Sequence, residues 1–486
     1  MAFLAVAALP LVLSWAQCAL PPTGNDALAY HLAHSKQFVL DHRIGPLALT
    51  RESMWPYLTE MLFALGLAIE GTTLAQLFHW IFYGLTAWTI YLYGKRFYGA
   101  AAGRIASIVF LYTPVAYAQS SQAYVDLSLT FFVFLAFYVF MLMPKVGEGA
   151  AALICGFFAG AAASVKYLGL GCGAILLILW VLRAKKKWMT PLVYLIAFGL
   201  VAAVWYLRSW IALGNPVYPF FHLFFGGNGY DMKIAEGVGV GNGPLQFILL
   251  LWNMTMRPEP FGGDLVGPIY LLFVPLLLLR RRAKSEGMGK YFLVFTLLYG
   301  LFIFTQSQQT RFFLSVMPYL SLGVGVFLTA RPDGPHLRYA RIALLMSLVM
   351  IAGIFVYRFT PGWSVLSAKR SWEDYLQGTE HSFLGQKYLA GHLKAGQKAL
   401  NGADVRIFYG PMDRMVYVEY PLKMYLIKNR ISLQGYLDRE RFDYFWLKKG
   451  NLPQLWNYAE RGGYKEVYRY DFAEDKINSE YVILKK

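Results

Sequence analysis

Long apolar runs recur along most of the chain and constrain its fold more than any other feature. A helix needs about 20 predominantly apolar residues to cross a hydrocarbon core of about 30 Å. Eleven runs reach or approach that length. They span residues 1–20, 73–93, 104–118, 127–143, 149–165, 168–182, 190–213, 264–280, 291–306, 312–330 and 340–357. The pattern predicts a membrane all-α protein, a polytopic bundle of about 11 transmembrane helices.

The charged residues indicate the same class of protein. Only 15% of the residues are charged, whereas a soluble domain usually carries about a quarter. The net charge of +17 could indicate a nucleic-acid partner, but the basic residues form no single patch. They cluster in short segments between apolar runs, at 95–104, 183–187, 280–290 and 331–341. Such clusters are typical of cytoplasmic loops, so we expect a lipid bilayer around the chain and no nucleic acid.

The same charges predict the orientation of the chain. If the N-terminus is inside and every run crosses, the basic clusters fall in cytoplasmic loops. The outer segments before residue 358 then hold ten acidic and eight basic residues. The first run has no basic residue before it, so we expect a retained helix rather than a cleaved signal peptide. We expect a multi-pass protein of a bacterial inner membrane, with its site and its C-terminal domain outside.

Charge also divides the chain into two expected domains. Residues 1–357 form a membrane domain with long outer loops at 21–72 and 214–263, whereas residues 358–486 are much richer in charge. In that second part, apolar runs at 405–409 and 481–484 alternate with amphipathic stretches at 383–393 and 452–461. The alternation of such segments predicts a small extracytoplasmic α/β domain.

Two carboxylates lie at the predicted outer ends of helices. Asp26 follows the first run, at the start of an expected helix over 27–40, and Asp126 precedes the fourth run. Either residue could be a helix N-cap, a position that Asp favours. Alternatively, both face one cavity, where burial and mutual repulsion would raise the proton affinity of one of them. Such a carboxylate can accept the proton of an acceptor hydroxyl.

Three basic residues, Lys166, Arg208 and Arg311, lie at the same expected level. Each could be a side chain that snorkels to the head groups from a helix end. However, positive charge at the outer ends runs against the topology rule, which favours a specific partner for these side chains. A phosphate at that depth would be such a partner, because Arg and Lys form charge-assisted hydrogen bonds to it.

Several short segments together resemble the C superfamily of glycosyltransferases (GT-C), membrane enzymes that use polyprenyl-phosphate-linked sugars. The likeness covers residues 1–357 and is greatest for the branch with protein O-mannosyltransferases and bacterial lipid A aminoarabinose transferases. It rests on Asp26 after the first helix, Ala-Tyr-Val-Asp-Leu at 123–127, Val-Lys-Tyr-Leu-Gly-Leu at 165–170, Gly-Asn-Pro-Val-Tyr-Pro at 214–219 and Gln-x-Arg-Phe at 309–312. The chain departs from the family where Ala27 follows the first acid instead of Glu, and where Ser-Met-Trp-Pro at 53–56 replaces the Glu-Lys-Pro of the aminoarabinose enzymes.

The resemblance implies a reaction and a set of site residues. A sugar would move from a polyprenyl phosphate to an extracytoplasmic lipid, glycan or protein, with inversion at the anomeric carbon. The implied residues are Asp26 and Asp126 for catalysis, Arg311, Lys166 and Arg208 for the donor phosphate, and Tyr30, His31, Tyr124 and Gln309 for contact with the substrate. No metal ligands and no certain cofactor are implied, and a divalent metal ion is compatible with the reaction.

A transporter or flippase of lipid-linked sugars is the main alternative. It shares the apolar helices, the basic loops and the lipid contact, but it predicts polar residues or broken helices near the middle of the membrane. The centres of the apolar runs hold almost no ionisable residues. A non-catalytic scaffold or receptor would explain the C-terminal domain but not the ordered charges at the outer ends. The sequence therefore favours a transferase.

Overall fold

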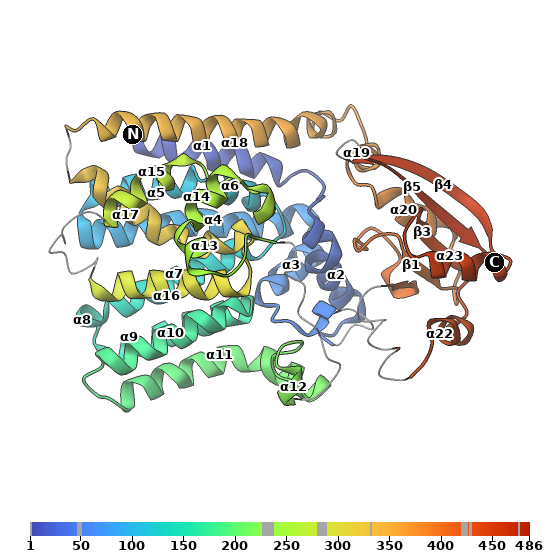
Figure 1. Ribbon diagram of the computed structural model, residues 1–486, viewed down its shortest axis with the longest axis horizontal. Helices are drawn as coiled ribbons and strands as arrows, with labels where there is room; N and C mark the ends of the chain where they lie inside the picture. The colour runs from blue at the N-terminus through green and yellow to red at the C-terminus, as the bar shows by residue number, and fades with distance from the viewer. Residues whose placement is uncertain are drawn as a thin grey trace.

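The computed structural model describes residues 2–45, 51–225, 238–278, 289–330, 333–418, 426, 430–474 and 477–486. In these residues, long helices run roughly parallel to one another, and a small sheet with its own helices lies beyond one end of them (Figure 1). The chain is therefore mostly helical with a small C-terminal sheet, as the sequence predicts.

Each of the eleven apolar runs contains a helix. These helices are α1 (Ala2–Gln17), α4 (Thr72–Tyr98), α5 (Ala100–Leu111), α7 (Asp126–Met141), α9 (Glu148–Val165), α10 (Leu168–Arg183), α11 (Met189–Leu213), α15 (Pro268–Leu278), α16 (Lys290–Gln306), α17 (Met317–Thr329) and α18 (His336–Leu366). Within the described residues, three of them, α9, α11 and α18, are long and apolar enough to cross a membrane. A bent pair of helices would make a fourth span. The predicted number of about 11 crossings thus stays a prediction.

The run at 104–118 is two helices rather than the single one that its composition predicts. After α5, helix α6 (Pro114–Ser120) starts at an angle of 64° to it. Proline explains the break, because Pro114 has no N–H for the preceding turn and disfavours helical backbone at Thr113. Thr113 is accordingly extended, with φ −78° and ψ 114°. The bend places α6 in contact with α18 and with η6 (Thr310–Ser315).

The first outer segment, 21–72, places short helices between the long helices and the C-terminal sheet (Figure 1). They are η1 (Ala27–His31), α2 (Leu32–Asp41), η2 (Arg51–Met54) and α3 (Leu58–Ile69). The helix expected over 27–40 is thus present, but its first turn, η1, is a π-helix. Such turns are rare in proteins, and many of those that occur lie at functional sites. This one directly follows Asp26.

Short elements and one tight turn connect the remaining helices. The short elements are α8 (Met143–Val146), α12 (His222–Phe225), α13 (Pro244–Ile248), α14 (Leu250–Met256) and η4 (Glu259–Phe261). Between α9 and α10, Lys166 is extended, with φ −158° and ψ 149°. The two helices pack so closely after this turn that a Cβ atom on Gly169 would lie 2.2 Å from the carbonyl of Ala162. This packing fixes the position of Lys166.

The C-terminal part contains a five-stranded sheet with the strand order β2-β1-β3-β5-β4. Its elements are α19 (Trp372–Thr379), α20 (Phe383–His392), β1 (Ala399–Gly402), η7 (Met412–Arg414), β2 (Met415–Tyr417), α22 (Leu433–Glu440), β3 (Tyr444–Lys448), α23 (Pro453–Arg461), β4 (Lys465–Glu474) and β5 (Ile477–Lys485). β1 pairs in parallel with β2 and β3, whereas β5 pairs antiparallel with β3 and β4. The amphipathic stretches predicted from the sequence correspond to α20 and α23.

The apolar run at 405–409 forms no strand, unlike the run at 481–484, which lies in β5. It reaches the first outer segment instead. Ile407 N–H donates to Leu28 O at 3.2 Å, and Tyr409 O–H donates to Pro22 O at 2.8 Å. A short apolar run has the same composition whether it forms a strand or packs against another part of the chain, so the sequence pattern does not separate the two. The C-terminal part is thereby joined to the turn η1.

Candidate functional site

Asp26 does not cap a helix. Its backbone is already helical, and its side chain makes no capping hydrogen bond. The carboxylate instead accepts hydrogen bonds from Tyr30 O–H at 3.0 Å and from Arg311 Nη2 at 2.5 Å. The side chains of Asp26 and Arg311 are 18% and 14% exposed, so solvent still reaches the pair. This ion pair joins the first outer segment to η6.

Asp126 and Lys166 form a second ion pair. Asp126 is the first residue of α7, and no side-chain cap is made there either. Lys166 Nζ donates to Asp126 Oδ1 at 3.0 Å. The ammonium also lies 3.7 Å from the ring centre of Phe312, the neighbour of Arg311 in sequence. Lys166 and Arg311 therefore point to carboxylates rather than to lipid head groups.

The two ion pairs act on each other electrostatically. Burial alone would raise the pKa of Asp26 and of Asp126, but the charges of Arg311 and Lys166 hold both pKa values below their ordinary range. Burial alone would lower the pKa of Arg311, but the two carboxylates raise it. Burial does lower the pKa of Lys166, against the opposing effect of Asp126. Both carboxylates are therefore ionised at neutral pH.

Polar and aromatic side chains surround the guanidinium of Arg311. Its Nε donates to Gln309 Oε1 at 3.0 Å, and its central carbon lies 5.1 Å from the ring centre of Tyr124. The ring of His31 lies 5.9 Å from that of Tyr124, and its Nδ1 is 2.6 Å from Glu60 Oε1, with both residues buried. The four residues that the sequence assigns to substrate contact thus all lie beside the ion pairs.

Arg208 is the exception among the residues predicted to bind phosphate. It lies on α11, and its Nη2 donates to Ser53 O at 3.2 Å and to Trp55 O at 2.7 Å. Its guanidinium also lies over the rings of Tyr57 and Trp205, at 5.4 and 5.1 Å. In the part of the chain that the structure describes, its Nε and Nη1 have no hydrogen-bond partner. Arg208 thus holds the first outer segment against α11. A contact between Arg208 and a phosphate stays a prediction.

Two charged residues that no motif singles out lie at the same place. Asp264 follows η4 and accepts hydrogen bonds from Gln119 Nε2 at 3.3 and 3.4 Å. The charges of Arg311, Arg358 and Asp126 all act on this carboxylate. Arg358 lies on α18. The only local signal that Asp264 and Arg358 carry is their position at the predicted ends of apolar runs, 264–280 and 340–357.

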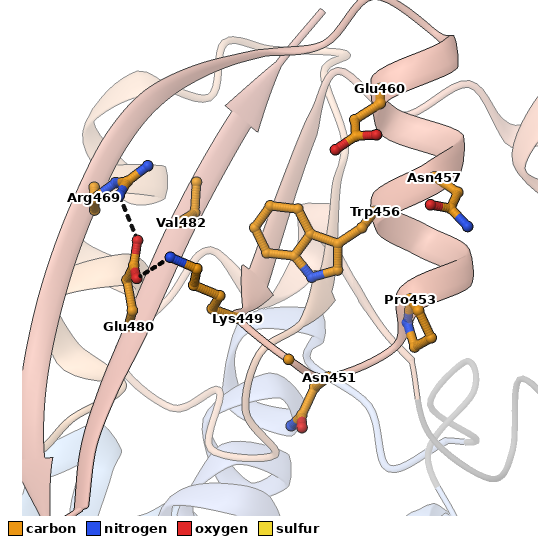
Figure 2. A pocket seen from close by; sticks show the side chains of 10 residues that line it. Lys449, Asn451, Pro453, Trp456, Asn457, Glu460, Arg469, Glu480 and Val482 are labelled. Carbon is orange, nitrogen blue, oxygen red and sulfur yellow. Dashed lines mark hydrogen bonds and ion pairs between the residues drawn. The ribbon is translucent and has the colours of Figure 1, made fainter.

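The structure also has a cavity of about 340 Å³ in its C-terminal part, between α23 and the strands β4 and β5 (Figure 2). Trp456 points into it, and on its rim Glu480 forms ion pairs with Lys449 and Arg469 (Figure 2). None of the residues predicted to form a site lines this cavity. Among the described residues, no three His, Cys, Asp or Glu side chains are grouped so as to hold a metal ion.

Comparison with known proteins relates the chain to glycosyltransferases by its fold. Residues 53–210 match the family model of dolichyl-phosphate-mannose-protein mannosyltransferases. No curated protein sequence matches the chain significantly. Crystal structures of ArnT from Cupriavidus metallidurans match in the apo state, with a TM-score of 0.65 and 14% identity, and bound to undecaprenyl phosphate, with 0.62 and 15%. Each match covers 99% of this chain and 97% of ArnT. The chain has a GT-C glycosyltransferase fold.

Another GT-C structure shows the same likeness at a greater distance. It is the archaeal oligosaccharyltransferase AglB from Archaeoglobus fulgidus, in complex with an inhibitory peptide and a dolichol-phosphate. The match has a TM-score of 0.53 and 12% identity and covers 99% of this chain and 74% of AglB. The structural matches therefore extend beyond residues 1–357, where the sequence resemblance ends, and cover nearly the whole chain.

Proposed function

We propose that this chain transfers a sugar from a polyprenyl phosphate to an acceptor at the outer face of a membrane. The observation that carries the proposal is the meeting of two ion pairs, Asp26 with Arg311 at 2.5 Å and Asp126 with Lys166 at 3.0 Å. Transfer from a phosphate needs both kinds of charge, a carboxylate for the acceptor hydroxyl and cations for the departing phosphate. The GT-C fold and the undecaprenyl phosphate bound to ArnT support the same chemistry.

In the proposed reaction, the acceptor hydroxyl oxygen attacks the anomeric carbon from the side opposite the phosphate. The bond from that carbon to the phosphate oxygen breaks, and its electron pair leaves with the phosphate. The hydroxyl proton passes to Asp26, while Arg311 and Lys166 stabilise the negative charge that develops on the phosphate. The transition state is oxocarbenium-like, as in other glycosyl transfers, and the anomeric configuration is inverted.

The contact between Asp26 and Arg311 links donor binding to the activity of the base. Burial alone would raise the pKa of Asp26, but the guanidinium holds it below the ordinary range. At rest, Asp26 is therefore a poor base. A donor phosphate that takes the N–H groups of Arg311 weakens the pair and raises the proton affinity of the carboxylate. The base is thus strengthened when the donor is present.

A strain that lacks the gene tests the proposed transfer. Mass spectrometry should find a glycoconjugate that lacks one sugar in this strain, and the wild-type chain should restore it. Asp26→Asn should not restore it, whereas Asp41→Asn, which changes an exposed carboxylate of α2, should. Restoration by Asp26→Asn to more than about a tenth of wild type would remove Asp26 from the chemistry, since a positioned base contributes about 10²–10⁴-fold. An unchanged glycoconjugate profile would contradict the transfer itself.

A further inference from the structure

Three polar side chains beside the ion pairs take no part in the proposed reaction. They are Gln119 at the end of α6, Asp264 after η4 and Arg358 on α18. These residues come from distant parts of the chain. The loop that carries Asp264 is held against α6 because Val115 N–H donates to Leu265 O at 2.8 Å. The bend between α5 and α6 therefore brings the amide and the carboxylate together.

The hydrogen bonds between the amide of Gln119 and the carboxylate of Asp264 are long. Gln119 Nε2 lies 3.3 and 3.4 Å from the two oxygens of Asp264, beyond the usual length of an N–H···O bond. Gln119 Oε1 has no partner among the described residues, although Gln119 is only 5% exposed. Buried amide oxygens are almost always hydrogen-bonded. The arrangement is therefore incomplete without a further polar group.

Arg358 supplies hydrogen-bond donors to the same place. Its Nη1 donates to Ala118 O at 2.6 Å and to Ser121 Oγ at 3.4 Å. A guanidinium carries five N–H donors in a fixed fork, and these two contacts use only one of its nitrogen atoms. Asp264 and Tyr124 both lie close enough to Arg358 to influence its guanidinium electrostatically.

The three side chains adjoin the end of the site where the acceptor would react. Gly24, two residues before Asp26, packs against the turn after α6. A Cβ atom on Gly24 would lie 2.7 Å from Gln122 Oε1 and 3.1 Å from Tyr124 Oη. Gln122 Oε1 also has no hydrogen-bond partner in the described part of the chain. Gln119 beside Asp264 and Gln122 beside Gly24 thus both have an unsatisfied amide oxygen among the described residues.

We propose that Asp264, Gln119 and Arg358 bind the hydroxyl groups of the donor sugar. This inference rests on the proposed function and names the part of the site that would hold the sugar ring. Sugar hydroxyls both donate and accept, a carboxylate accepts, a guanidinium donates and an amide does both. A second phosphate is disfavoured here because the charge of Asp264 would repel it. An uncharged polyhydroxylated ring fits the mixture of charges.

Binding of two kinds of lipid to the full chain in nanodiscs tests the inference. The probes are undecaprenyl phosphate and its mannose, glucose and arabinose derivatives. Wild-type protein should bind at least one sugar-linked lipid about tenfold more tightly than undecaprenyl phosphate, and Asp264→Asn should abolish this preference, since each lost bond to a charged group is worth about tenfold or more. Its affinity for undecaprenyl phosphate should change by less than about twofold, as expected for a residue away from the phosphate. Glu259→Gln, an exposed residue in the same loop, is the matched control and should keep the preference.

Each other outcome overturns the inference in a distinguishable way. If wild-type protein binds all the lipids equally, the sugar subsite is wrong but the proposed function stands. If Asp264→Asn loses affinity for every lipid, a second variant, Gln119→Met, removes the amide at similar volume. That variant should lower the sugar preference alone, and a uniform loss there too would make the group structural. If wild-type protein binds none of the lipids, the proposed function falls, and the inference falls with it.

Discussion

Asp26 and Arg311 form one ion pair that, in the proposed reaction, would serve two substrates. At rest, each side chain satisfies the other across 2.5 Å. In the proposed reaction, the phosphate needs the guanidinium and the acceptor hydroxyl needs the carboxylate. Donor binding therefore requires Arg311 to exchange its contact with Asp26 for a contact with the phosphate. Substitutions of Asp26 and of Arg311 should thus have opposite effects on donor binding.

Asp26→Asn should bind undecaprenyl phosphate about 3- to 10-fold more tightly than wild type, because the phosphate no longer competes with a carboxylate for Arg311. Titration of the lipid into protein in nanodiscs measures this affinity. Asp41→Asn, with its exposed side chain, should bind as wild type does. Weaker binding by Asp26→Asn would mean that Asp26 helps to hold the donor.

Arg311→Ala should weaken binding of the same lipid by about 1.5–3 kcal/mol, the range for a hydrogen bond to a charged group. Arg311→Lys should recover only part of this loss, because Lys keeps the charge but not the forked geometry. Arg257→Ala, at an exposed position between α14 and η4, should have no effect. Unchanged affinity in Arg311→Ala would move the phosphate contact to Lys166 or Arg208.

Helix packing positions the second cation. Lys166 lies in the turn between α9 and α10, and the two helices can approach closely there because residue 169 is glycine. A side chain at that position would press on the carbonyl of Ala162, 2.2 Å away, and push the helices apart. The position of the ammonium thus depends on a contact within the helical bundle rather than on the site alone.

Gly169→Ala should lower the free energy of unfolding by about 1–3 kcal/mol, the usual cost of overpacking, and should also weaken donor binding. Thermal unfolding in detergent measures the first effect, and the lipid titration measures the second. The control is Gly199→Ala on α11, where a Cβ atom would meet nothing within 4 Å. Equal melting temperatures for the two variants would contradict the role of this packing.

Local patterns in the sequence predict the helices, whereas the roles of single site residues depend on contacts between distant parts of the chain. The apolar runs place eleven helices, and Pro114 is a local signal for the break before α6. The role of Asp26 is not local, because a cap and an ion pair require the same residue type at the same position. Its partner Arg311 is 285 residues away in sequence. Asp264 was missed for the same reason, since its contact with Gln119 depends on the bend between α5 and α6.

At the scale of the whole molecule, the C-terminal part contacts the turn η1, which directly follows Asp26. Lys36 Nζ on α2 donates to Phe408 O at 2.7 Å, and Ile407 N–H donates to Leu28 O in η1 at 3.2 Å. These contacts come from the loop between β1 and η7, which joins the C-terminal part to the first outer segment. We predict that the C-terminal domain holds the Asp26 turn in place or helps to capture the acceptor, and that it supplies no catalytic group.

Tyr409→Phe removes the hydrogen bond from Tyr409 O–H to Pro22 O, which is 2.8 Å long. Turnover should fall by about 2- to 10-fold, in line with about 0.5–1.5 kcal/mol for such a bond, while affinity for undecaprenyl phosphate stays at the wild-type value. Steady-state kinetics and the lipid titration separate the two effects. Tyr357→Phe, at a position that is 81% exposed, should leave both unchanged. A loss of lipid affinity in Tyr409→Phe would place this loop at the donor site instead.

The central claim is that the ion pairs cleave a polyprenyl-phosphate sugar rather than carry it. The most direct measurement is the amount of polyprenyl phosphate that purified protein in nanodiscs releases from a polyprenyl-phosphate sugar, with acceptor extracted from a strain that lacks the gene. Wild-type protein should release the phosphate as the sugar appears on the acceptor with inverted configuration. Asp26→Asn should release it at less than about a hundredth of that rate. Wild-type protein that binds the donor but never cleaves it, whatever acceptor is present, would contradict the claim and favour transport of the lipid-linked sugar.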